Sequence, residues 1–312
     1  MLTYIVSSFL DYSLLICDDA GPGYAISMGW AYKYLDEFDR VENDETFIVD
    51  NRVQQNEIEK LEKLVSANSG NRFFFKVVDP YQELYASHYY YQFLSKISQY
   101  KNAYLLSVYE PRELTAEVSK LFQNRFIHLP YPYIKSKEVE TSRKRKKILI
   151  SGSLNKDVYP YRYRIWEIVT RSVSRIFFFS ILKHPGYAEM DSHKSHSHNL
   201  IKGAFIDHLS LYKYMLLCPS RCGIEFLKYN ECAYAGCIPV GLAPGSYPDG
   251  VKAIFLSLRP EKFLKDVLKI FFSADTKNRL AKLRTFLTET RNPEILNIVL
   301  NRFIDENPIH TS

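Results

Sequence analysis

The chain has 312 residues and a mass of 36.5 kDa, a size that suits two domains of roughly 150 residues each better than one core. Hydrophobic residues make up 46% of it and charged residues 24%, which excludes disordered, collagen-like and coiled-coil classes. The 41 Lys and Arg exceed the 35 Asp and Glu by six, and the run Arg143-Lys144-Arg145-Lys146-Lys147 alone supplies five positive charges. We interpret this run as a solvated linker, with contact to an anionic membrane surface as the alternative, and expect no nucleic-acid binding.

The apolar stretches are too short for the roughly 18 to 20 residues that a membrane-spanning helix needs. The first ten residues are apolar but lack a basic leader, so we expect no signal peptide. The five cysteines are interpreted as reduced, buried thiols. These features predict a cytoplasmic protein. The alternative is a cytoplasmic protein that contacts a membrane surface through the basic run.

Short apolar runs alternate with amphipathic stretches along the first half of the chain. Strands are expected at residues 13–18, 46–50, 72–78, 103–109 and 125–129. Helices are expected at residues 25–38, 53–67, 81–99 and 113–122. This alternation is typical of right-handed βαβ units and predicts a parallel sheet with helices on both faces.

A second series of strands and helices follows a segment at residues 130–147 that resembles a linker. Strands are expected at residues 147–150, 175–182, 214–218 and 238–242. Helices are expected at residues 161–173, 206–213, 228–235, 260–272, 277–290 and 293–304. We therefore predict an α/β protein with two doubly wound halves that face each other across a cleft, where ligands bind beyond the carboxyl ends of the strands.

The predicted domains follow from this order of elements. Residues 1–135 form an acceptor-binding domain, residues 136–146 a basic linker and residues 147–290 a nucleotide-sugar-binding domain. Residues 291–312 form a C-terminal helix that crosses back to the first domain.

The most informative segment is Glu231-Cys232-Ala233-Tyr234-Ala235-Gly236-Cys237-Ile238-Pro239-Val240. A carboxylate at a helix start can accept both hydroxyls of a ribose. The segment resembles the E-x-x-A-x-G-x-P-V signature of GT-B glycosyltransferases, most of all the group 1 C-terminal domain and next the exostosin-type enzymes. The turn Ile150-Ser151-Gly152-Ser153, followed by Tyr159-Pro160-Tyr161-Arg162, is similar to the strand, turn and YP-x-R that open the donor domain of that family. The resemblance covers residues 146–303.

This resemblance implies a GT-B fold and a hexosyl- or pentosyltransferase of polysaccharide biosynthesis. Such an enzyme moves a sugar from a nucleotide-sugar to a glycan, lipid-linked or protein-linked acceptor, with the nucleotide-sugar as co-substrate and no cofactor. The resemblance also implies that Glu231 binds the ribose. The retaining family-4 branch carries another glutamate eight residues earlier, where this chain has Gly223, with Glu225 two residues further on. The stereochemical outcome therefore stays open.

The diphosphate of such a donor requires cations or backbone amides. The candidates are Arg162, Lys213, Arg221 and Lys228, with the turn at Gly152 and Ser153 as a source of N–H groups. Lys213 is expected just before a buried strand and Arg221 just after it. A surface position is the ordinary alternative for each cation.

A general base is expected from the first half of the chain. Asp18 and Asp19 precede the flexible Gly21-Pro22-Gly23 turn, with a loop-capping role as the alternative, and Glu110 is the rival. We interpret His193, His196 and His198 as part of a mobile loop rather than as metal ligands. The sequence contains no D-x-D motif, and we expect metal-independent transfer. A non-catalytic GT-B scaffold that binds sugar or an assembly partner is the alternative function.

Overall fold

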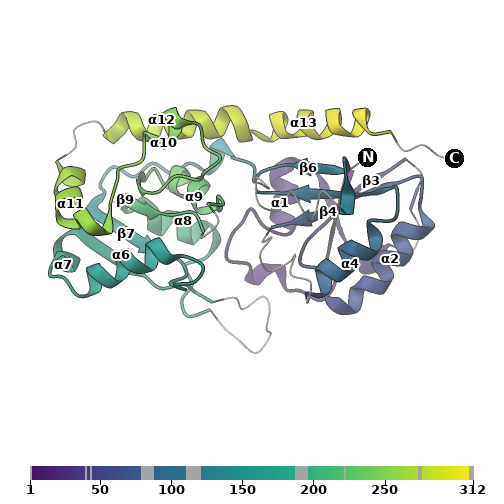
Figure 1. The fold of residues 1–312 in the computed structure, drawn as a ribbon, viewed down its shortest axis with the longest axis horizontal. Coiled ribbons are helices and arrows are strands. Elements are labelled where there is room, and N and C mark those ends of the chain that lie inside the picture. The colour runs from purple at the N-terminus through teal and green to yellow at the C-terminus, as the bar shows by residue number, and fades with distance from the viewer. Residues whose placement is uncertain are drawn as a thin grey trace. The chain divides into compact units, whose positions relative to one another are not determined.

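The computed structural model describes residues 2–38, 41, 42, 44–78, 88–109, 121–186, 196–220, 223–272 and 276–308, with the side chains of 276 and 277 left out. The chain divides into two compact units. Unit 1 comprises Met1–Pro132 and Pro293–Ser312, and unit 2 comprises Tyr133–Asn292. The chain therefore passes from one unit to the other twice (Figure 1).

Unit 1 contains a six-stranded parallel sheet with the order β2-β1-β3-β4-β5-β6. Its strands are β1 (Leu2–Val6), β2 (Ala31–Tyr34), β3 (Thr46–Val49), β4 (Arg72–Val77), β5 (Ala103–Ser107) and β6 (Phe126–His128). Because β2 and β3 lie on opposite sides of β1, the winding direction changes between β1 and β3. Ligands of such sheets bind beyond the carboxyl ends of the strands at this switch point.

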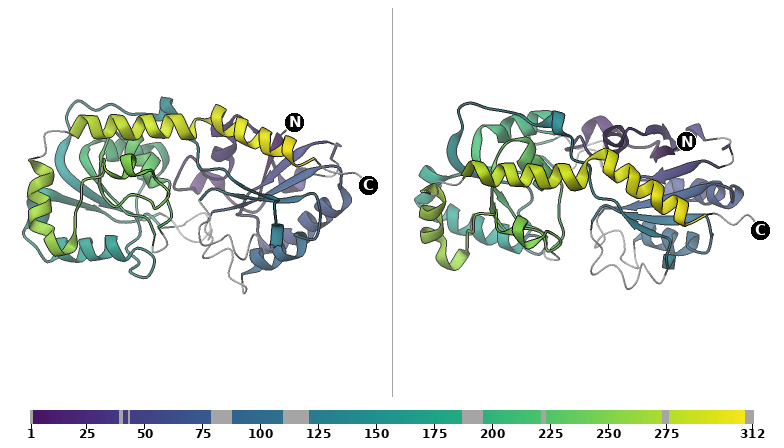
Figure 2. Two further views of the ribbon diagram at one scale, coloured as in Figure 1. Left: turned by 45° about the horizontal axis from the view of Figure 1, so that its top comes forward. Right: turned by 90° about the horizontal axis from the view of Figure 1, so that it is seen from above.

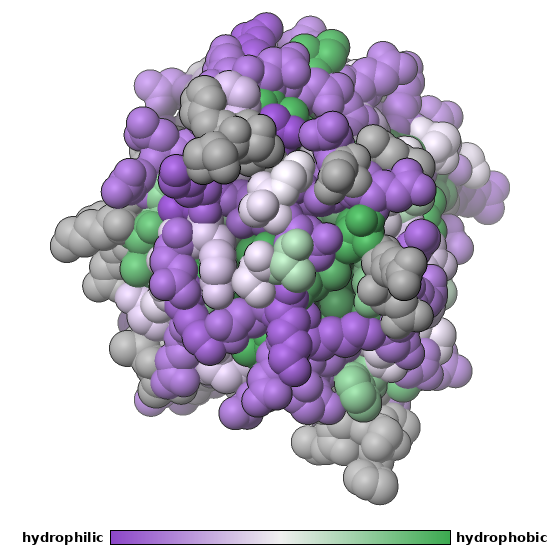
Figure 3. Space-filling model, turned by 90° about the vertical axis from the view of Figure 1, so that its right-hand side faces the viewer, coloured by the Kyte–Doolittle hydropathy of each residue, from purple (hydrophilic) through white to green (hydrophobic). Residues whose placement is uncertain are grey.

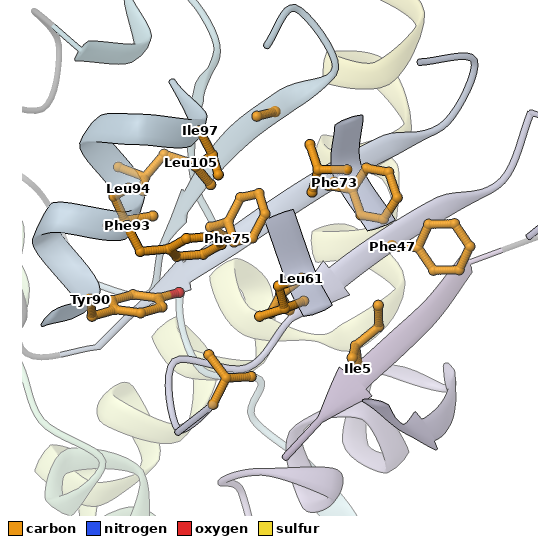
Figure 4. Close-up of a cluster of buried hydrophobic side chains, with 14 of the residues drawn as sticks. Ile5, Phe47, Leu61, Phe73, Phe75, Tyr90, Phe93, Leu94, Ile97 and Leu105 are labelled. Carbon is orange, nitrogen blue, oxygen red and sulfur yellow. The ribbon is translucent and has the colours of Figure 1, made fainter. Parts of the chain in front are cut away.

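Helices cover both faces of the unit 1 sheet. The helices are α1 (Pro22–Met28), α2 (Ile58–Ala67), α4 (Tyr89–Ile97) and α13 (Pro293–Glu306), with single 3₁₀ turns η1 (Tyr12–Leu14), η2 (Leu35–Glu37) and η3 (Gln55–Glu57). Phe73 and Phe75 of β4 pack toward α2 and α4, and the ring of Phe75 lies 5.4 Å from that of Phe93 (Figure 4). The alternate residue Phe74 faces the other way, against Phe303 of α13.

The C-terminal helix α13 is an integral part of unit 1. It packs beside α1 (Figure 2). Asn297 of α13 accepts a hydrogen bond from the indole N–H of Trp30 at 2.7 Å and donates one to the carbonyl of Met28 at 2.9 Å. These contacts fix α13 to the chain segment that follows α1.

Unit 2 contains a four-stranded parallel sheet with the order β10-β9-β7-β8. Its strands are β7 (Arg145–Ser151), β8 (Phe179–Leu182), β9 (Tyr212–Leu217) and β10 (Ile238–Gly241). Strands β8 and β9 lie on opposite sides of β7, so the switch point of this sheet lies between β7 and β9. The residues that follow these two strands form the edge at which a ligand is expected.

Two hydrophobic clusters sandwich the unit 2 sheet. The helices are α6 (Pro160–Thr170), α7 (Ser174–Phe178), α8 (Lys202–Ser210), α9 (Lys228–Tyr234), α10 (Asp249–Lys252), α11 (Phe263–Phe271) and α12 (Thr276–Arg291), with 3₁₀ turns η4 (Lys135–Lys137) and η6 (Pro260–Lys262). Ile148 and Ile150 of β7 pack with α6 and α11, whereas Leu149 packs with α8, α9 and α12. This alternation is the side-chain period of a strand covered on both faces.

Two of the predicted elements near the N-terminus are wrong. Residues 13–18 form no strand, because Asp11 accepts a hydrogen bond from the backbone N–H of Ser13 and starts the turn η1. The first strand is the earlier apolar run β1. The helix predicted at residues 25–38 ends at Met28, because Gly29 adopts φ 74° and terminates it. The chain then continues into the edge strand β2.

Two further predictions in the second half are corrected. Residues 175–178 belong to α7, so only the second part of the strand predicted at 175–182 is a strand. Strand β7 begins at Arg145, so the last three residues of the basic run lie in a strand rather than in a linker. Lys144 is also held, because its ammonium donates to the carbonyl of Ala235 at 2.7 Å.

The surface carries few large hydrophobic areas on the face drawn in Figure 3, where hydrophilic side chains predominate between smaller apolar areas. Within the described ranges, no helix has the length and apolar character that a bilayer crossing requires.

Candidate functional site

The turn after β7 brings two cations against a glycine. Gly152 adopts φ 96°, a left-handed conformation that favours glycine. A Cβ atom on Gly152 would lie 2.7 Å from Cε of Lys228 and 2.9 Å from Nη1 of Arg162. Both long side chains therefore pack onto the backbone at the carboxyl end of β7, and any larger residue at 152 would displace them.

Arg162 is the central cation of this cluster. It lies in the first turn of α6 and is only 2% exposed. Its Nη1 donates to the carbonyl of Ser153 at 3.0 Å, and its guanidinium lies 4.5 Å from the ring of Tyr159. In the described part of the chain no carboxylate pairs with Arg162, and its buried Nε has no hydrogen-bond partner. A buried cation without a counter-ion is costly, and an anionic ligand would satisfy it.

Lys228 and Glu231 come to the same place from the first turn of α9. The ammonium of Lys228 lies 3.6 Å from a carboxylate oxygen of Glu231 and 4.7 Å from the ring centroid of Phe205. Glu231 is 8% exposed. The structure therefore brings together four residues predicted for the donor site, namely Gly152, Arg162, Lys228 and Glu231.

His184 and Cys218 follow β8 and β9, the two strands on either side of β7. Burial, together with the nearby cations of Lys228 and Arg162, lowers the pKa of His184 to about 4. Its Nδ1 accepts a hydrogen bond from the N–H of Gly186 at 3.0 Å. Burial raises the pKa of Cys218, and Arg162 partly offsets that rise. At pH 7 the imidazole and the thiol are therefore neutral, and the fixed positive charge of the cluster comes from Arg162 and Lys228.

Glu225 is engaged elsewhere in unit 2. Its carboxylate accepts a hydrogen bond from Tyr247 at 2.6 Å and pairs with Arg291 at 2.7 Å, and all three side chains are buried. Glu225 thereby ties the loop before α9 to the end of α12. Gly223, the residue eight positions before Glu231, adopts φ 72°.

Of the other predicted donor residues, Ser153 contacts this cluster through its backbone, Lys213 lies apart from it, and Arg221 is not among the described residues. Ser153 contributes its carbonyl to Arg162, while its hydroxyl accepts from the N–H of Asn155. Lys213 lies inside β9 at the amino end of that strand, not before the strand as predicted. Burial and the neighbouring Lys146 lower the pKa of Lys213. Arg221 lies outside the described residues.

The histidine-rich segment contains the residues that were considered as metal ligands. His193 lies outside the described residues, and Nε2 of His198 lies 2.8 Å from the carbonyl oxygen of Lys183. Where the structure describes the chain, no group of three or more His, Cys, Asp or Glu side chains is arranged to hold a metal ion.

The candidate bases of unit 1 have different surroundings. Asp19 is buried and accepts a hydrogen bond from the hydroxyl of Ser27 on α1 at 2.9 Å. Asp18 is exposed, and its carbonyl approaches Gly23 so closely that a Cβ there would lie 1.6 Å from it. Glu110 lies outside the described residues.

Three buried side chains at the switch point of unit 1 form a hydrogen-bonded series that was not predicted from the sequence. The ammonium of Lys76 donates to the hydroxyl of Tyr4 at 2.6 Å, and that hydroxyl donates to the carboxylate of Asp50 at 3.0 Å. Burial and the charge of Asp50 raise the pKa of Tyr4. The signal was a lysine inside the apolar run of β4, at a position where only a specific partner makes burial tolerable.

Comparison with known proteins gives matches at the level of structure. No family model matches the chain, and no curated protein matches it by sequence. The crystal structure of a mutant of TarM from S. aureus, in complex with Fondaparinux, alpha-GlcNAc-glycerol and UDP, matches 86% of this chain at 11% identity with a TM-score of 0.57. TarM in another crystal structure matches at 12% identity, 86% coverage and a TM-score of 0.54. The GtfA/B complex matches at 10% identity, 88% coverage and a TM-score of 0.50.

The fold is GT-B. The prediction of an α/β chain with two Rossmann-like, doubly wound halves is thereby confirmed. The chain spans a little more than half of the length of these proteins, between 57% and 59%. At this level of identity the likeness concerns the fold.

The GT-B signature segment is not a literal match. Tyr234 stands where E-x-x-A-x-G-x-P-V has alanine, and two residues rather than one separate Gly236 from Pro239. Tyr234 fills a structural role, since its ring stacks on Tyr133 at 4.8 Å and its hydroxyl accepts from the N–H of Ile134. Gly236 adopts φ 64° and ends α9 before β10.

Proposed function

We propose that this chain is a glycosyltransferase whose unit 2 binds a nucleotide-sugar and whose activity moves the sugar to a glycan, lipid-linked or protein-linked acceptor, in the biosynthesis of a polysaccharide or related glycan. The observation that carries the proposal is Arg162, a buried cation that has no carboxylate partner among the described residues and lies at the switch point of the unit 2 sheet. The GT-B fold supports it, and so does the presence of UDP in the TarM complex.

The diphosphate would bind between Arg162, Lys228 and the backbone at Gly152. The planar guanidinium can donate two parallel hydrogen bonds to phosphate oxygens, and Lys228 adds a point charge. As the bond from the sugar to the diphosphate breaks, negative charge grows on the leaving oxygen, and preorganised cations stabilise that charge. Two such cations perform the role that a metal ion has in other transferases, so we propose transfer without a metal.

The ribose would bind to Glu231. Its carboxylate lies beside the ammonium of Lys228, which places a hydroxyl acceptor next to the proposed phosphate position. For the acceptor, we propose the exposed Asp18 of unit 1 as general base in preference to Asp19, whose carboxylate is buried against Ser27.

The first experiment is calorimetric titration of the whole chain with UDP, GDP, ADP, CMP and dTDP in the presence of EDTA. Arg162→Met should weaken binding of the preferred nucleotide about 10- to 100-fold, because hydrogen bonds to charged groups contribute roughly 1.5 to 3 kcal/mol. Arg164→Met is the matched control, because Arg164 is exposed on the same helix. Equal affinities for both variants would refute the assignment of Arg162.

Pyrophosphate separates the two halves of the proposed site. Arg162→Met should weaken binding of both pyrophosphate and nucleotide. Glu231→Gln should weaken only the nucleotide, because pyrophosphate has no ribose. A Glu231→Gln protein that binds the nucleotide like wild type would refute the ribose assignment while leaving the phosphate assignment in place.

A non-catalytic GT-B scaffold is the second candidate, and the engagement of Glu225 favours it. In sequence, Glu225 is the glutamate nearest to the position of the second glutamate in the retaining branch. Its carboxylate is already bonded to Tyr247 and Arg291. Such a scaffold would bind nucleotide without turning over the donor. Release of free nucleotide from the matching nucleotide-sugar, followed over hours with and without a glycan acceptor, distinguishes the two functions.

A further inference from the structure

Unit 2 exposes a set of large apolar side chains on α7 and α11 and on the cap residues Val173 and Phe272 that flank these helices. The two helices are neighbours, since the rings of Phe178 and Phe271 lie 4.8 Å apart (Figure 1). The apolar side chains are between 51% and 84% exposed, and they are Val173, Ile176, Phe177, Leu264, Leu268 and Phe272. We name this surface the α7–α11 face.

Helix α11 presents an apolar stripe to solvent as well as to the core. Its inner face buries Phe263, Val267 and Ile270. On its outer side Leu264, Leu268 and Phe272 recur at every fourth residue, which places them in one row. The exposed Lys265 and Lys269 each follow one of these leucines. Exposed apolar residues that alternate with lysine in this way are typical of helices that lie in a membrane interface.

Further basic side chains border α7. The ammonium of Lys147 donates to the carbonyl of Ile176 at 2.9 Å, which joins the end of the basic run to this helix. Lys146 lies close enough to Lys213 to lower its pKa, and Arg175 is exposed on α7 itself.

The acidic groups near the face are few and mostly paired. Glu167 pairs with Arg171 at 2.9 Å, and the buried Asp266 pairs with Arg259 at 2.7 Å, while Glu261 is exposed. Apart from Glu261, the exposed charged side chains described for α7 and α11 are the cations Arg175, Lys265 and Lys269.

We propose that the α7–α11 face docks unit 2 on an anionic lipid bilayer. The apolar row would enter the interface between headgroups and acyl chains, while the lysines would contact anionic headgroups. A second copy of the chain fits less well, because a two-fold interface would bring each cluster of lysines against its own copy. Lys146 and Lys213 lie at the amino ends of β7 and β9, whereas Gly152 follows the carboxyl end of β7. Docking at the α7–α11 face would thus leave the proposed donor site of unit 2 uncovered.

Co-sedimentation with vesicles tests this docking. The whole chain is mixed with vesicles of phosphatidylcholine and phosphatidylglycerol in equal parts, and separately with vesicles of phosphatidylcholine alone. The combined variant L264S/L268S/F272S and the variant K265S/K269S should each weaken partition onto the anionic vesicles about tenfold or more. Ile298→Ser is the matched control and should bind like wild type, because Ile298 is similarly exposed, at 59%, on α13. Nucleotide titration of every variant reports separately on the fold and on the proposed donor site.

Three outcomes would overturn the proposal. Wild type could fail to prefer anionic over neutral vesicles, or the variants could bind anionic vesicles as well as wild type does. Self-association of the wild type that L264S/L268S/F272S abolishes, without vesicle binding, would instead assign the face to a second copy of the chain.

Discussion

Gly152 shows how one missing side chain makes room for two cations. We expect Gly152→Ala to destabilise the chain by about 1 to 3 kcal/mol, because alanine strains the left-handed backbone there, and also to weaken nucleotide binding. Gly186→Ala is the matched control: Gly186 adopts φ 98°, but no described atom lies within 4 Å of its missing Cβ. Urea unfolding and calorimetry of both variants separate backbone strain from displacement of Arg162 and Lys228. Unchanged nucleotide affinity in Gly152→Ala would contradict the packing described for this turn.

His184 couples the stability of unit 2 to pH. Its pKa is about 4 in the folded chain and about 6.5 when unfolded, so between these values the unfolded chain binds more protons. The free energy of unfolding should therefore fall as the pH is lowered from about 6.5 to about 4. His184→Asn, which keeps an acceptor for the N–H of Gly186, should reduce this dependence in urea unfolding at pH 7 and 5. An equally steep dependence in the variant would show that other groups cause it.

Among the elements, the buried ion pair of Glu225 and Arg291 fixes the end of α12. Arg291→Met should destabilise the chain by about 3 to 5 kcal/mol, because it leaves a buried carboxylate without its cation. Arg302→Met is the control, since Arg302 is exposed on α13. We expect R291M/E225Q to recover part of the loss. If chemical denaturation gave the same midpoint for Arg291→Met and Arg302→Met, the pair would contribute little.

The elements that could be predicted from sequence are those with uninterrupted apolar runs. Strands β3 and β4 are fully or almost fully buried, and their runs of aromatic and branched residues indicated them directly. The exposed edge strand β2 has no such run, and its sequence continues the apparent helix of α1, so its assignment depended on the conformation of Gly29.

The candidate site was predictable in part for a similar reason. The segment that contains Glu231 is local in sequence, so its motif could be found without a structure. Burial of Arg162 depends on Tyr159, Gly152 and the strand ends that surround it, which lie together only after folding. Lys213 was misplaced because β9 begins before its apolar run, and a lysine stem can lie along a strand while its ammonium reaches solvent.

At the scale of the whole molecule, the proposed reaction requires a residue from each unit. We expect Asp18→Asn to lower turnover with a glycan acceptor about 100-fold or more while leaving nucleotide affinity unchanged, because a general base contributes roughly 10²- to 10⁴-fold. Asp19→Asn provides the comparison and should act mainly on stability through Ser27. Steady-state kinetics with calorimetry measures both effects. A normal rate in Asp18→Asn would move the search for a base to other residues of unit 1.

The double crossing of the chain sets an order for its assembly on the ribosome. Unit 2 is continuous and can complete its core once residue 292 has been made, whereas unit 1 waits for α13 to place Phe303 on Phe74 and Asn297 against Trp30. Until then Phe74 and Tyr104 of the first sheet lack the cover of Phe303, although their strands were synthesised earlier. The nascent chain therefore exposes these aromatic side chains until α13 has been made, and such surface favours aggregation or chaperone binding.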